Sequence, residues 1–107
     1  MKDRPMSVLR FEPTEAQIQH ACIELLRQLT IPVYRVGQRD ARGAQDPGVS
    51  DLIVLSPTYG TIFAEVKTKS GAQSAAQRQF MCDVEAAGGR YELVRSCYEL
   101  ACLLGGS

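Results

Sequence analysis

Apolar residues recur along three stretches of the chain at the spacing of helices. Each stretch opens with a serine or threonine followed three residues later by glutamine or glutamate, which is the capping-box pattern of a helix start. The three pairs are Thr14 with Gln17, Ser74 with Gln77, and Ser96 with Glu99. The pattern predicts helices that end before Ile31-Pro32, at Gly88-Gly89 and at about Leu104. The predicted core-facing residues are Ile18, Cys22, Leu25, Leu26 and Leu29 in the first helix and Phe80, Met81, Val84 and Ala87 in the second.

Four shorter apolar runs are typical of strands: residues 33–36, 52–55, 61–64 and 91–94. The middle two flank turn residues at 56–60 and therefore predict a β-hairpin. Both faces of this hairpin are largely apolar, which indicates a sheet covered on both sides. The order helix, three strands, helix, strand, helix predicts an α/β fold with a four-stranded sheet flanked by helices. Residues 1–12 show no clear period, and we expect an irregular arm or an edge strand there.

Two acidic residues, Asp51 and Glu65, lie at the base of the predicted hairpin, and Lys67 follows two positions later. If the turn pairs Leu55 with Thr61, opposed residues have numbers that sum to 116, as 51 and 65 do. Directly opposed side chains lie roughly 5 Å apart, where two like charges destabilise a sheet. Lys67 shares this face because side chains alternate along a strand. The arrangement predicts a divalent cation beside the lysine. The alternative is a solvent-facing hairpin with a Glu65–Lys67 pair, against which the apolar flanking residues argue.

Composition narrows the class of protein. The 107 residues suit one domain over residues 1–107. The sequence has no apolar tract of about 18 residues and no secretory signal, so we expect a cytoplasmic protein that does not span a membrane. One histidine, His20, and four scattered cysteines do not make an ordinary zinc site, and we expect buried free thiols and a surface histidine. The net charge of zero does not by itself indicate a polyanionic partner.

Basic residues nevertheless gather around the predicted hairpin. The polar segment 37–48 is long for a hairpin connection in a small domain and carries Arg39 and Arg42. Lys69 and Arg78 follow the third predicted strand. With the acidic residues neutralised by metal, the local field would be positive, and we expect these four side chains to contact DNA. For Arg39 and Arg42 the alternative is a pair of solvated loop charges.

Three groups of residues, taken in order, resemble the VRR-NUC branch of the PD-(D/E)XK nuclease superfamily. They are Gly48-Val49-Ser50-Asp51-Leu52, then Glu65-Val66-Lys67, and then Gly71, Ser74 and Gln77. The resemblance runs from Glu15 to about Val94, with one departure, because the proline that usually precedes the aspartate is Ser50 here. It implies a restriction-endonuclease-like αβββαβ core with a mixed four-stranded sheet. It also implies site roles for Glu15, Asp51, Glu65 and Lys67, and hydrolysis that leaves a 5′-phosphate and a 3′-hydroxyl.

The chemistry that these residues favour is metal-assisted phosphodiester hydrolysis. Magnesium, for which manganese can substitute, takes hard oxygen ligands, and Asp51, Glu65 and the Val66 main-chain carbonyl would supply them. The ion would activate a water, which Lys67 would orient or help to deprotonate. Glu15 would bind a second ion or a water, or would only stabilise the N-terminus of its helix. Gln77 would reach the catalytic site, where the resemblance also places a glutamine, or would only complete its capping box.

The predicted function is that of a magnesium-dependent DNA endonuclease. Stand-alone members of the family resembled here are structure-selective, which implies branched DNA such as a four-way junction, cut by a homodimer. No small-molecule cofactor is expected. Two alternatives stay open: a catalytically silent nucleic-acid binding or assembly module of the same fold, and a nuclease that acts on another nucleic acid such as RNA. The intact set of Asp51, Glu65 and Lys67 argues against the silent module.

Overall fold

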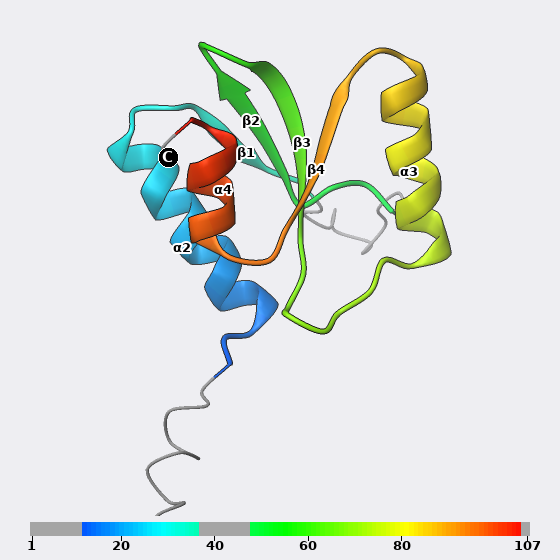
Figure 1. The fold of residues 1–107 in the computed structure, drawn as a ribbon, viewed down its shortest axis with the longest axis horizontal. Helices are drawn as coiled ribbons and strands as arrows, with labels where there is room; N and C mark the ends of the chain where they lie inside the picture. The colour runs from blue at the N-terminus through cyan, green and yellow to red at the C-terminus, as the bar shows by residue number, and fades with distance from the viewer. Residues whose placement is uncertain (1–11, 37–47, 106–107) are drawn as a thin grey trace, which may run out of the picture.

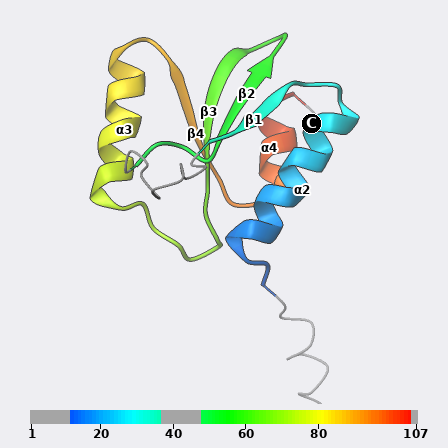
Figure 2. The same ribbon diagram turned by 180° about the vertical axis from the view of Figure 1, so that it is seen from behind.

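The computed structural model describes residues 12–36 and 48–105. Its elements follow in the order α2 (Glu15–Gln28), β1 (Val33–Arg35), β2 (Leu52–Ser56), β3 (Gly60–Val66), α3 (Ala75–Ala86), β4 (Arg90–Val94) and α4 (Cys97–Leu103). The strands form one sheet in the order β1-β2-β3-β4, in which β3 and β4 are parallel and the other neighbours antiparallel. Helix α3 lies on one side of the sheet, and α2 and α4 lie on the other (Figures 1 and 2). The predicted element order and mixed, helix-flanked sheet are confirmed.

The helices begin where side chains satisfy the free N–H groups of the first turn. In α2, Thr14 Oγ1 accepts from the Gln17 N–H at 3.1 Å, and the Thr14 N–H donates to Gln17 Oε1 at 2.9 Å. Ser74 and Gln77 make the same reciprocal pair at the start of α3. In α4, Ser96 accepts from the Glu99 N–H, but the Glu99 carboxylate accepts from the Arg95 N–H at 2.8 Å. The start of the third helix is therefore predicted correctly. The Glu99 side chain, however, bonds to the N–H of Arg95, whereas a capping box would require the N–H of Ser96.

Helix α2 ends in a Schellman motif. The Ile31 N–H donates to the Leu26 carbonyl at 2.8 Å, and the Thr30 N–H donates to the Arg27 carbonyl at 3.0 Å. Thr30 has φ 57°, a left-handed conformation that a β-branched residue rarely adopts. Leu29 is 49% exposed because the helix has already ended, so the prediction that it faces the core is wrong.

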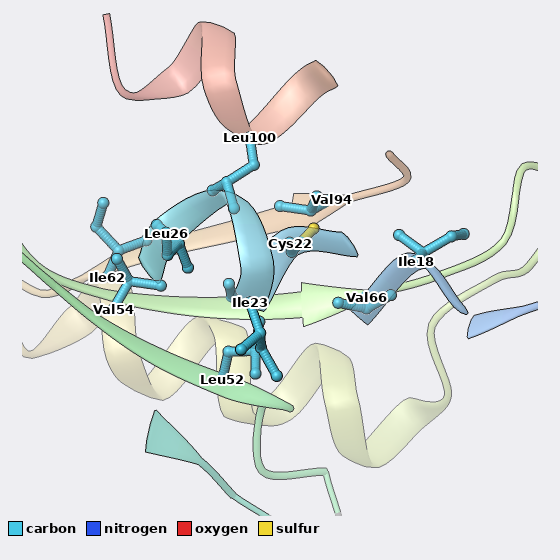
Figure 3. Close-up of a cluster of buried hydrophobic side chains, with 11 residues drawn as sticks. Ile18, Cys22, Ile23, Leu26, Leu52, Val54, Ile62, Val66, Val94 and Leu100 are labelled. Carbon is cyan, nitrogen blue, oxygen red and sulfur yellow. The ribbon is translucent and has the colours of Figure 1, made fainter. Parts of the chain in front are cut away.

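The main hydrophobic core lies between the sheet and helices α2 and α4 (Figure 3). Its members are Ile18, Cys22, Ile23, Leu26, Leu52, Val54, Ile62, Ala64, Val66, Val94 and Leu100. On the other side of the sheet, Phe80 of α3 packs edge-on against Phe63 and Tyr91, with ring centroids 5.7 and 6.2 Å away. Val84 of α3 is buried as predicted, but Ala87 is exposed. The sheet is therefore covered on both sides, with the denser apolar packing under α2 and α4.

The cysteines are free thiols in different environments. Cys22 is buried in the core and Cys97 is partly buried, but Cys82 and Cys102 are exposed. The prediction of buried thiols is wrong for these two, because each lies on the outward face of its helix. In the ranges that the structure describes, no helix has the length and apolar character needed to cross a membrane.

Candidate active site

The hairpin register brings the two acidic residues to one end of the sheet. Residues pair from Ser56–Gly60 to Leu52–Ala64, as predicted, and Asp51 and Glu65 are the next positions of this register. Asp51 Oδ2 accepts from the Val66 N–H at 2.7 Å, so the side chain replaces a main-chain acceptor where the ladder ends. The Asp51 carbonyl accepts from the Val36 N–H at 2.8 Å. Asp51 is thus tied to the strands on both of its sides.

Glu65 is buried, with 1% of its surface exposed. Its Oε2 accepts from Gln77 Nε2 at 2.7 Å, whereas its Oε1 is buried without a hydrogen-bond partner among the residues that the structure describes. The pKa of Glu65 is raised to about 8, mainly by burial and then by the nearby Asp51, while the charge of Lys67 opposes the rise. A buried carboxylate oxygen without a partner lowers the stability of the fold, and either a proton or a cation at Glu65 Oε1 would relieve this cost.

The donor set fits magnesium better than a softer metal. Magnesium is usually held by one or two carboxylates, several waters and a substrate phosphate. Asp51 and Glu65 provide two carboxylates, and the unpartnered Glu65 Oε1 provides a free ligand atom. Within residues 12–36 and 48–105, no group of three or more His, Cys, Asp and Glu side chains could hold a metal ion. Glu15 is therefore not gathered with the two carboxylates into one ligand set, and the Val66 carbonyl as a ligand stays a prediction.

Lys67 lies at the end of β3, where its N–H donates to the Val94 carbonyl at 3.0 Å. Its side chain is 12% exposed, and its Nζ lies 4.0 Å from Oε2 of the half-exposed Glu15. At that distance and exposure the pair contributes little to stability. Glu15 also raises the pKa of Glu65, as the smallest of its causes. Glu15 thus lies at the rim beside Lys67, and its predicted metal or water role stays a prediction.

Gln77 makes both of the contacts that the sequence left as alternatives. Its Oε1 accepts from the Ser74 N–H at 2.8 Å, which completes the capping box. Its Nε2 donates to Glu65 Oε2 at 2.7 Å. One side chain therefore fixes the first turn of α3 and the orientation of the Glu65 carboxylate, while its catalytic role stays a prediction.

The segment before Asp51 packs directly on α3. Gly48 has φ 84°, and a Cβ at this position would lie 2.3 Å from the Ala76 carbonyl oxygen, so only glycine fits. Ser50, at the position where the resembled family has proline, is buried, and its hydroxyl donates to the Leu52 carbonyl at 3.3 Å. The Ser50 hydroxyl is thus satisfied by the backbone at the start of β2.

Tyr91 is a neighbour of the acidic pair that sequence reasoning missed. It is buried on β4, where it pairs with Phe63, and its hydroxyl accepts from Gln73 Nε2 at 3.0 Å. The pKa of Tyr91 is raised to about 12, mainly by burial and to a smaller extent by the charges of Glu65 and Asp51, while the hydrogen bond from Gln73 opposes the rise. The sequence predicts a strand here, but only the parallel pairing of β4 with β3 places this hydroxyl near the site.

Two of the four predicted DNA-binding residues lie in the described part of the chain. Lys69 is exposed in the segment after β3, and Arg78 is exposed on α3. Arg78 Nη1 donates to the Gln73 carbonyl at 2.9 Å, which ties the start of α3 to the preceding segment. Arg39 and Arg42 lie outside the described residues.

Comparison with known proteins identifies the fold. No protein-family description and no curated protein matches the sequence. A solved structure described as "VRR_NUC domain" is similar, with a TM-score of 0.69 and 21% sequence identity, over 87% of this chain and 97% of that one. A second, "VRR_NUC domain protein", has a TM-score of 0.71 and 14% identity, over 89% of this chain and 88% of that one. The chain therefore has the fold of VRR_NUC domains, and the predicted resemblance is confirmed at the level of the fold.

Proposed function

We propose that this protein is a magnesium-dependent DNA endonuclease whose site is formed by Asp51, Glu65 and Lys67. The observation that carries the proposal is the buried Glu65 Oε1, which lacks a partner among the described residues and lies beside a second carboxylate. A purely structural sheet end gains nothing from two facing carboxylates. The fold that the chain shares with two VRR_NUC structures supports a nuclease-type domain.

The residues of the chain would divide the work as follows. Asp51 and Glu65 would hold the ion, which supplies activation of a water and stabilisation of charge on the phosphate. Gln77 occupies Oε2 of Glu65 and so keeps Oε1 free for the ion. Lys67 would place its ammonium against the scissile phosphate or the attacking water. Hydrolysis would leave a 5′-phosphate and a 3′-hydroxyl.

The DNA would lie along the end of the sheet that carries the acidic pair. Lys69, exposed in the segment that joins β3 to α3, and Arg78, exposed on α3, would contact phosphates together with Arg39 and Arg42. A four-way junction presents two strands for cleavage, which a homodimer with two sites would serve. Sedimentation of the protein alone and with a junction tests this stoichiometry.

A cleavage assay tests the proposed activity. Labelled four-way junction, flap, nicked duplex, linear duplex and RNA are each incubated with the protein in magnesium, in manganese and in a chelator. We expect cleavage of branched DNA that needs the metal and is lost in Asp51→Ala. Glu24→Ala, which removes an exposed carboxylate paired with Arg27 on α2, is the matched control and should cut normally. Binding without cleavage in every metal would instead indicate a silent module, and cleavage of RNA alone would indicate a ribonuclease.

A further inference from the structure

The segment between β3 and α3 begins with a tight turn over residues 68–71. The Gly71 N–H donates to the Thr68 carbonyl at 3.2 Å, which closes the turn. This turn directly follows Lys67 and leads to Gln73, Ser74 and the first turn of α3. Its conformation therefore affects the residues on both of its sides.

One arginine lies against the carbonyl groups of this turn. Arg95 Nη1 is 2.6 Å from the Thr68 oxygen, 2.7 Å from the Gly71 oxygen and 3.2 Å from the Lys69 oxygen. This nitrogen carries two hydrogens, so the two short contacts are full hydrogen bonds and the third is shared. Hydrogen bonds from a charged donor are stronger than those between neutral groups. Three carbonyl dipoles of one turn thus converge on one positive charge.

The turn of residues 68–71 also lies against the side chain of Lys67. A Cβ built on Gly71 would be 3.5 Å from Lys67 Cδ and 3.0 Å from Thr68 Oγ1, so Gly71 is packed beside the stem of the lysine. The Lys67 N–H donates to the carbonyl of Val94, the residue before Arg95. Arg95 is anchored in addition through its own N–H, which donates to Glu99 at the start of α4.

We propose that Arg95 is a positioning residue, which holds the turn of residues 68–71 against Lys67 and thereby fixes the lysine beside the acidic pair. Its catalytic consequence rests on the proposed nuclease function, but its effect on Lys67 does not. Lysine at this position keeps the charge but concentrates it on one compact ammonium, so Arg95→Lys should still hold the turn against Lys67 in part. Arg95→Ala and Arg95→Gln should lose most of this positioning.

Nuclear magnetic resonance of the lysine side chains tests this without any activity measurement. The chain has three lysines, Lys2, Lys67 and Lys69, so the signals of ¹³C-labelled lysine Cε groups are few, and Lys67→Arg assigns the one of interest. In Arg95→Ala we expect the Lys67 signal to move toward the position of an exposed lysine, and in Arg95→Lys to move less. Arg90→Ala is the matched control. It removes the arginine at the start of β4, whose Nε donates to Glu92 at 2.8 Å.

Cleavage of the junction by the same variants gives the second measurement. Arg95→Ala should cut roughly 10- to 100-fold more slowly than the parent, because a small misplacement of a catalytic group has effects of that size. Arg90→Ala should cut normally. A Lys67 signal that stays unchanged in folded Arg95→Ala would overturn the positioning role, as would unchanged cleavage. If Arg95→Ala does not fold, Arg95→Gln decides by the same two outcomes. A parent protein without activity would refute the nuclease proposal and leave the Lys67 signal as the test of Arg95.

Discussion

The two faces of the central sheet carry different kinds of residues, although they belong to the same strands. On the face toward α2 and α4, Leu52, Val54, Ile62, Ala64 and Val66 are all at most 1% exposed. On the face toward α3, the alternating residues include Leu55, which is 37% exposed, and Glu65, a buried acid. The first face is almost entirely apolar, whereas the second carries the two carboxylates where the strands end.

One face of the sheet therefore contributes mainly to stability, and the other carries the candidate site. Apolar burial under α2 and α4 supplies the favourable free energy of folding. Facing carboxylates on the other side oppose folding, as expected where a site is arranged for a ligand rather than for the fold. Substitutions on the two faces should therefore act on different measured quantities.

The largest effect on activity is expected from Lys67→Ala. Removal of a group that orients or deprotonates the attacking water lowers rates by roughly 100- to 10,000-fold. The melting temperature should change little, because the Glu15–Lys67 contact of 4.0 Å is weak. Junction cleavage under single-turnover conditions and a thermal scan measure the two quantities. A variant that cuts at the parental rate would remove Lys67 from the chemistry.

For Leu26→Ala, by contrast, the expected effect is a large loss of stability. Leu26 is fully buried between α2 and the sheet, and truncation of such a leucine lowers the free energy of unfolding by about 2–5 kcal/mol. Leu29→Ala is the matched control, since this leucine of the same helix end is 49% exposed and should cost far less. Urea unfolding followed by circular dichroism gives both values. Equal losses in the two variants would contradict the assignment of the core.

Stability of the metal-free protein should depend on pH through Glu65. Its pKa rises from the ordinary value of 4.5 to about 8 in the folded state, so folding takes up a proton. Stability is then fully present below about pH 4.5 and is lost as the pH rises toward 8, by about 1.4 kcal/mol for each unit of the shift. Urea unfolding in chelator at several pH values should show this fall in the parent and not in Glu65→Gln. Parallel curves for the two proteins would show that folding does not change the pKa of Glu65.

The smallest effect is expected at the end of α2, away from both faces. Thr30 has φ 57°, and the left-handed conformation costs a residue with a Cβ about 1–2 kcal/mol. Glycine removes this strain but loses more chain entropy on folding, so Thr30→Gly should raise the free energy of unfolding by up to about 1 kcal/mol. Cleavage should not change. A destabilised Thr30→Gly would show that the threonine side chain stabilises this turn by contacts.

The features that sequence predicts best are those decided by neighbours along the chain. The capping boxes of α2 and α3 join residues three apart, and the hairpin register follows from its short turn, so both could be derived in advance. That register alone brings Asp51 beside Glu65. The features that escaped prediction depend on how distant elements pack.

Three residues illustrate this limit. Tyr91 approaches the acidic pair only because β4 lies parallel to β3. Gly48 requires the segment before β2 to meet the backbone of α3, and Arg95 reaches back to carbonyl groups more than 20 residues earlier in the chain. No periodic pattern encodes such contacts, because they are fixed by the tertiary structure as a whole.

The central claim is that the pair of Asp51 and Glu65 is held for a divalent cation. The most direct test is the melting temperature of the parent and of Glu65→Gln, each measured at pH 8 in chelator and in rising magnesium. At this pH we expect Glu65→Gln to be more stable than the parent in chelator, because one of two facing carboxylates is gone. Magnesium should stabilise the parent in a concentration-dependent way and leave Glu65→Gln nearly unchanged. A less stable Glu65→Gln, together with a parent that does not respond to magnesium, would contradict the claim.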